Sequence, residues 1–93
     1  MSQPKDDIED LRNLGKISGA WLRSVGIVTQ QQLRDFGAVV AFKIIRDRNP
    51  RVNLNLLWAM AAGLEGRDWR ELSAHEKDRL QVELKRLTQA DEM

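Results

Sequence analysis

The sequence contains no cysteine and no tyrosine, and it has a single histidine. Without cysteine the chain has no disulfide, no thiolate metal ligand and no cysteine nucleophile. His75 has no second histidine or cysteine with which to share a metal ion. No apolar stretch is long enough to cross a bilayer, and residues 2–10 are polar and acidic, so we expect neither a membrane segment nor a signal peptide. These absences favour a cytoplasmic protein.

The chain also lacks an excess of charge of one sign, because its 15 lysines and arginines are balanced by 14 acidic residues. Proteins that bind nucleic acid without sequence preference usually carry a clear basic excess, so any such contact here requires a local basic face. The sequence has no glycine-rich phosphate loop, no Ser-His-Asp set and no carboxylates at metal-ligand spacing. We therefore predict no catalytic residue, cofactor, metal or small-molecule substrate, and a protein that acts by binding.

What is present is helical patterning. A chain of 93 residues with 42% apolar residues fits one domain. Apolar spacing and capping signals predict helices at 7–13, 16–25, 30–36, 38–48, 54–64 and 74–87. Helix 54–64 is apolar nearly all round, which is typical of a buried central helix. The predicted fold is all-α, a small bundle of five to six short helices at 7–88, between flexible tails at 1–6 and 89–93.

An internal repeat marks two of the predicted helix connections. The run Leu11-Arg12-Asn13-Leu14-Gly15 recurs as Leu33-Arg34-Asp35-Phe36-Gly37. In each copy one helix is predicted to end and another to begin, since glycine, asparagine and aspartate tolerate a left-handed backbone. The amides that begin the next helix then form an anion site. The repeat predicts tandem helix-hairpin-helix-like motifs, a geometry that holds DNA phosphates without reading sequence.

Two basic groups are candidates for contact with DNA phosphates. They comprise Arg12, Asn13, Gly15 and Lys16 at the first corner, and Arg46, Arg48 and Arg51 at the end of the predicted helix 38–48. The second corner is a weaker candidate because Asp35 would repel a phosphate. The alternative interpretation is that both corners only connect helices and that the basic groups are solvated surface.

The three tryptophans allow two interpretations, a stacking platform for bases or a hydrophobic core. Trp21 and Trp58 lie among apolar helix positions, which favours the core. For helix 16–25, apolar spacing predicts a buried face that consists of Ile17, Ala20, Trp21 and Val25. Trp69 lies in a turn, where we expect it to cap the end of helix 54–64.

Two segments resemble a known family. The run LRNLGKISGAWLRSVGI is similar to the opening of the TfoX C-terminal domain, and RVNLNLLWAMAAGLEGRDWRELS is similar to its second half. This resemblance implies a small all-α domain and a link to the TfoX/Sxy regulators of natural competence, with no catalytic residues to carry over. Regulators of this family commonly carry a separate N-terminal domain, which these 93 residues lack. Lys16-Ile17 also stands where relatives often have proline and lysine.

Two functions follow as hypotheses. The first is a regulatory module with weak, sequence-independent and salt-sensitive binding to DNA phosphates. The second is a module that docks a transcriptional regulator, or a second copy of itself, without touching nucleic acid. The near-neutral charge favours the second hypothesis, whereas the repeated corner and the family resemblance favour the first.

Overall fold

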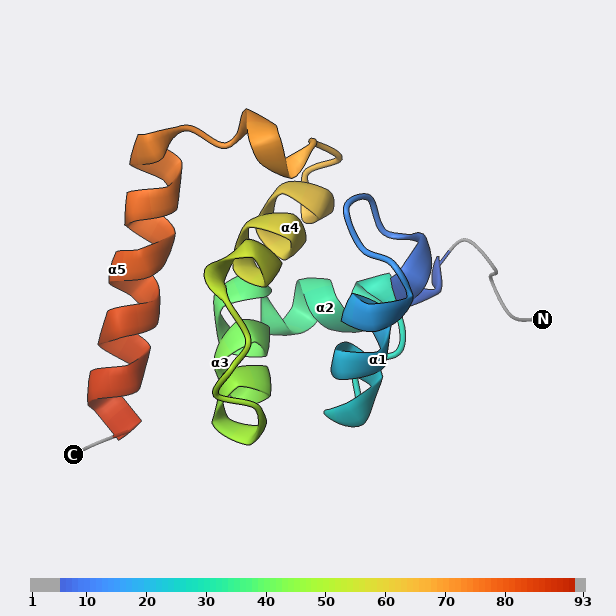
Figure 1. The fold of residues 1–93 in the computed structure, drawn as a ribbon, viewed down its shortest axis with the longest axis horizontal. Helices are drawn as coiled ribbons and strands as arrows, with labels where there is room; N and C mark the ends of the chain where they lie inside the picture. Colours follow the sequence, from blue (N-terminus) through green and yellow to red (C-terminus); the bar gives the residue numbers. More distant parts are fainter. Residues whose placement is uncertain (1–5, 92–93) are drawn as a thin grey trace.

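The computed structural model describes residues 6–91, and the predicted tail residues 1–5 and 92–93 lie outside this range. Within it the chain forms five α-helices and no strand, which confirms the all-α prediction (Figure 1). The helices are α1 (Lys16–Ser24), α2 (Gln30–Phe36), α3 (Ala38–Arg48), α4 (Leu54–Leu64) and α5 (Ala74–Asp91), with the short 3-10 helices η2 (Ile8–Asp10) and η3 (Trp69–Glu71).

Local capping accounts for most of the helix boundaries. Thr29 and Gln32 form the predicted reciprocal capping box at the start of α2. The Asn53 side chain accepts a hydrogen bond from the Asn55 amide and begins α4. After α1, Gly26 adopts a φ of 86°, a left-handed backbone that glycine accepts most easily and that ends the helix.

The core is centred on α4, as its apolar sequence predicts. Leu57 and Met60 on α4 are fully buried, and Trp58 is buried as well. Helix α4 packs against α3 on one side and against the segment that precedes α1 on the other. At that second contact α4 carries Gly63, where a Cβ atom would lie 2.4 Å from the Arg12 carbonyl oxygen. The glycine is therefore required by close approach of two backbones.

The N-terminal segment departs from the predicted helix at 7–13. Only the single 3-10 turn of η2 forms, and at Leu11 the backbone becomes extended. The reason is tertiary: the Ile8 amide donates to the Val28 carbonyl at 3.1 Å, which ties this segment to the chain before α2. Ile8 and Leu11 are both buried. A continuing helix would have to give up these contacts.

The two copies of the internal repeat do not share a backbone conformation. In the second copy two α-helices meet at Gly37, whose φ is 84°. In the first copy the left-handed residue is Asn13, with a φ of 77°, whereas Gly15 is extended and begins α1. Within residues 6–14 no α-helix precedes the first corner. Similar sequences thus form two different corners, because the first is tied down by contacts far away in the chain.

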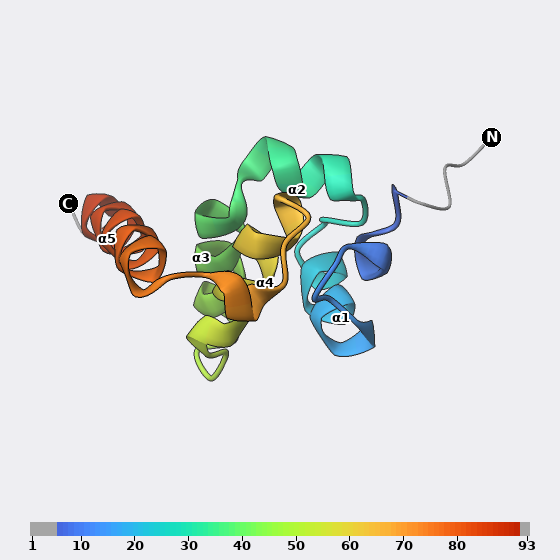
Figure 2. The ribbon, with the colours of Figure 1, turned by 90° about the horizontal axis from the view of Figure 1, so that it is seen from above.

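Helix α5 lies along one edge of the molecule beside α3 (Figures 1 and 2). Ser73 and Glu76 form the predicted capping pair at its start. Of its predicted apolar stripe, Leu84 is buried, and Leu80 and Leu87 are partly buried against the core. The helix continues to Asp91, past the predicted end at residue 87 and into the expected C-terminal tail.

Candidate functional site

The first corner presents an uncapped helix start beside exposed positive charge. Gly15 precedes α1 with extended backbone and offers no side chain to the amides of the first turn. Lys16, the first residue of α1, is exposed, and so are Gly15 and Arg12. These residues are exposed, but the corner is not preceded by the helix that the repeat predicted.

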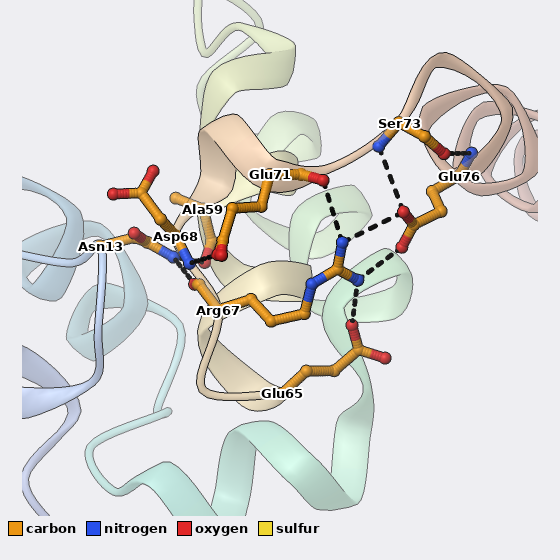
Figure 3. Close-up of polar contacts among 8 residues, drawn as sticks. All are labelled: Asn13, Ala59, Glu65, Arg67, Asp68, Glu71, Ser73 and Glu76. Atoms are coloured by element: carbon orange, nitrogen blue, oxygen red, sulfur yellow. Dashed lines mark hydrogen bonds and ion pairs between the residues drawn. The ribbon is translucent and has the colours of Figure 1, made fainter.

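Asn13, however, points into the fold rather than toward a ligand (Figure 3). Its Nδ2 donates to the carbonyl oxygens of Ala59 at 3.3 Å and Arg67 at 2.8 Å. Its Oδ1 accepts from the Trp69 backbone amide at 3.2 Å. Asn13 is therefore a clamp between the first corner and the connector that follows α4. Arg12 supports the same junction, because its Nη1 donates to the Gly66 carbonyl at 2.9 Å.

The second basic group is divided between two faces of α3. Arg46 donates to Thr88 Oγ1 on α5 at 3.2 Å and lies over the Phe42 ring. Arg48 instead donates to the carbonyl of Ser24, the last residue of α1, at 2.9 Å. Two positions separated by two residues point to opposite sides of a helix, which explains the division. Arg51 is exposed in the turn between α3 and α4.

The structure does not bring the two predicted groups into one basic face. Lys16 begins α1 and Ser24, which Arg48 contacts, ends it. A helix of nine residues separates its two ends by about 13 Å. Arg46, on the far side of α3, is directed toward α5. The seven candidates therefore do not form one continuous basic surface.

Arg67 is the centre of a polar cluster that the sequence did not reveal (Figure 3). Its guanidinium contacts both carboxylate oxygens of Glu76, at 2.6 and 3.1 Å, and it also bonds Glu65 and the Glu71 carbonyl. The pKa of Glu76 is lowered to about 2, mainly by the hydrogen bonds from Arg67 and to a smaller extent by the hydrogen bond from the Ser73 backbone amide. The capping pattern identified Glu76, but no local signal identified Arg67 as its partner. This cluster fixes the connector between α4 and α5.

An open apolar groove lies between α1, the start of α4 and η3. It has a volume of about 380 Å³, and its apolar lining consists of Ile17, Trp21, Leu56, Ala59 and Trp69. Its remaining lining residues are uncharged: Asn13, Ser18, Asn53 and Asn55. The Ile17 side chain is 73% exposed and Trp69 is 37% exposed.

This groove corrects one sequence prediction. Helix α1 does not bury the face of Ile17 and Ala20, because Gly19 and Leu22 are the residues that face the core. A Cβ at Gly19 would lie 2.5 Å from the Glu9 Cγ, so α1 approaches the N-terminal segment closely at its glycine. Trp69 lies in η3, which packs against α4, and its side chain is 37% exposed at the groove.

Two chemical features are absent from the described part of the chain. Residues 6–91 contain no cluster of three or more histidine or acidic side chains that could hold a metal ion. Over the same residues, none of the helices combines the length and the apolar character needed to cross a membrane.

Together these observations define a small, all-helical module with an apolar groove and dispersed basic residues. The family model of the TfoX C-terminal domain matches residues 4–84, so the chain belongs to this family. The family is of regulatory type. A crystal structure of an uncharacterized protein from Listeria monocytogenes has a similar fold, with a TM-score of 0.78 and 28% sequence identity. That match covers 88% of this chain and 93% of the other. No curated protein matches.

Proposed function

We propose that this domain is a non-enzymatic regulatory module that docks an apolar segment of a partner protein in the groove between α1, α4 and η3. The observation that carries the proposal is the exposure of Ile17 and Trp69 side by side with Trp21 in one groove. Large apolar side chains gathered on an open surface are typical of protein docking sites. Tryptophan is also the residue most enriched among those that dominate binding energy.

The chemistry of the lining specifies the partner. No charged side chain lines the groove, and its polar rim consists of amide and hydroxyl groups. A partner that inserts a charged side chain would leave that charge desolvated without a counter-charge. The groove therefore suits an uncharged apolar segment, and its volume of about 380 Å³ accepts a few side chains rather than a whole domain. In keeping with the family, the partner is a transcriptional regulator.

The test compares two exposed apolar residues. Ile17→Asp places a charge in the groove, whereas Val28→Asp makes the same kind of change at a residue that is 44% exposed and outside the groove lining. Immobilised wild type should retain a transcriptional regulator from a cell lysate, Val28→Asp should retain it equally, and Ile17→Asp should lose it. Retention of that regulator by both variants, or by neither, contradicts docking in this groove. Circular dichroism confirms that both variants are folded.

Weak binding to DNA phosphates at the first corner is the second candidate. The observation in its favour is the uncapped start of α1 beside the exposed Lys16. The hydrogen bonds of Arg12, Asn13, Arg46 and Arg48 to other parts of the fold count against a wider basic surface.

A gel shift with short duplex DNA at low and moderate salt decides this second candidate. Lys16→Glu should abolish retardation at low salt, while Arg34→Glu, an equal charge change at an exposed residue of α2, should preserve it. Equal behaviour of the two variants rules out the first corner. Arg48 is a poor probe because its loss also removes the hydrogen bond to Ser24.

A further inference from the structure

Helix α5 is long but contributes little to the core. It has 18 residues, yet among residues 6–91 the buried core takes only Leu84 from it, with Leu80 and Leu87 partly buried against that core. Helix α4, with 11 residues, buries seven of them. Most of the stability of a helix in a protein comes from the apolar face that it packs against other elements. Helix α5 is therefore held to the domain more weakly than α4.

The contact between α5 and its neighbours is also incompletely filled. A groove of about 530 Å³ is lined by α5 on one side and by Arg46 of α3 and Leu54 of α4 on the other. A smaller hollow of about 70 Å³ lies between Leu80 on α5 and Ala61 on α4. Side chains that line such spaces have packed atoms on only part of their surface, so the dispersion attraction across this contact is reduced.

Polar side chains hold α5 near both of its ends. Near its start, Arg67 of the connector bonds both carboxylate oxygens of Glu76. Near its other end, Arg46 on α3 donates to Thr88 Oγ1 at 3.2 Å. A bidentate contact between charged groups is stronger than a hydrogen bond to a neutral hydroxyl. The contact between Arg67 and Glu76 is therefore the stronger of these two attachments.

The opposite side of the domain is held together without α5. Helix α1 lies across the molecule from α5 in both views (Figures 1 and 2). Around it, Leu22, Ile27 and Leu33 are fully buried. Asn13 ties the first corner to the connector before α5, and Arg48 ties α3 to the end of α1. None of these hydrogen bonds involves a residue of α5, so they remain when α5 moves away.

We infer that α5 detaches from the domain as one unit while residues 6–72 remain folded, and that the contact between Arg67 and Glu76 controls how often it does so. Proteins open locally in contiguous units, and elements with few buried apolar contacts open most easily. Glu76 lies in the first turn of α5, where Ser73 caps the helix, so unfolding or displacement of α5 separates Glu76 from Arg67. This conformational change does not depend on the proposed docking groove.

Amide hydrogen exchange, followed residue by residue by NMR, tests the separate opening of α5. In the wild type, protection in α5 should be at least about 100-fold lower than in the most protected part of α4. Ile27→Val removes a buried methylene from the side of the core away from α5, so it should speed exchange in α4 about threefold or more. Exchange in α5 should stay unchanged, because the contacts of Ile27 persist while α5 is open. Equal protection of the two helices, or an equal response of both to Ile27→Val, overturns the inference.

A double-mutant cycle tests the role of the contact between Arg67 and Glu76. Glutamine at position 76 keeps the capping pattern with Ser73 while removing the charge. Arg67→Gln and Glu76→Gln should each speed exchange in α5 by about tenfold, which is the usual contribution of hydrogen bonds to charged groups. The double variant should speed it no further, because each single variant already removes the same contact.

The matched control is Arg70→Gln, the same substitution at an arginine of η3 that bonds Asp68 rather than a residue of α5. It should leave exchange in α5 as in the wild type. Additive effects of Arg67→Gln and Glu76→Gln, or an Arg70→Gln variant that opens as readily as the other two, show that this contact does not control α5. Ile17→Asp should leave exchange in α5 unchanged, which separates this inference from the proposed function.

Discussion

Replacing Asn13 tests whether this residue is a clamp or a ligand contact. The side chain makes three hydrogen bonds, at 2.8, 3.2 and 3.3 Å, to segments that lie far away in the sequence. Each such bond contributes about 1 kcal/mol net, so losing all three destabilises the domain by about 2–3 kcal/mol. The left-handed φ of 77° adds a second contribution, since alanine in this region costs about 1 kcal/mol.

Two substitutions separate these contributions. Asn13→Gly removes the hydrogen bonds but accepts the left-handed backbone, so we expect a loss of about 2–3 kcal/mol. Asn13→Ala removes the bonds and strains the backbone, so we expect about 3–4 kcal/mol. A domain of this size has a free energy of unfolding of about 5–14 kcal/mol, so these losses are a large share of its stability.

Urea unfolding followed by circular dichroism measures the difference. With a denaturant dependence of about 1–1.5 kcal/mol per molar urea, Asn13→Ala should lower the midpoint by about 2–4 M. A midpoint within about 0.5 M of the wild type would refute the clamp. If Asn13→Gly proves as destabilising as Asn13→Ala, the backbone part of the reasoning fails.

Two further predictions concern packing and charge. Gly63→Ala should destabilise the domain by about 1–3 kcal/mol in urea unfolding, although alanine favours helices, because its Cβ would collide with the Arg12 backbone. In the control Gly19→Ala, the new Cβ would contact only the Glu9 side chain, so the loss of stability should be clearly smaller. Equal losses of stability in the two variants would contradict this argument. The pKa of Glu76 is about 2 in the folded state, against 4.5 for a glutamate without these contacts. Its contact with Arg67 therefore stabilises the fold fully above pH 4.5, and this stabilisation is lost as the pH falls toward 2. The melting temperatures of wild type and Glu76→Gln should therefore differ most above pH 4.5 and converge in acid; a difference independent of pH would show that the charge has no role.

Part of the candidate site was predictable from sequence because it depends on neighbours in the chain. Lys16 at the exposed start of α1 and Asn13 in a left-handed turn both follow from local rules. The roles of Arg46 and Arg48 were not predictable, because each bonds a helix that is distant in the sequence. The groove with Ile17 was missed for the same reason, since apolar spacing marks a face but does not say what packs against it.

The sequence alone determined where most helices begin and end. Capping pairs such as Thr29 with Gln32, and glycines such as Gly26, act within a few residues, so these helix boundaries are set locally. Only the tertiary structure decided that the segment before α1 is a single 3-10 turn, that Gly19 rather than Ile17 faces the core, and that Arg67 binds Glu76. These choices depend on which surfaces exclude water together, and that property belongs to the assembled helices rather than to any one stretch of chain.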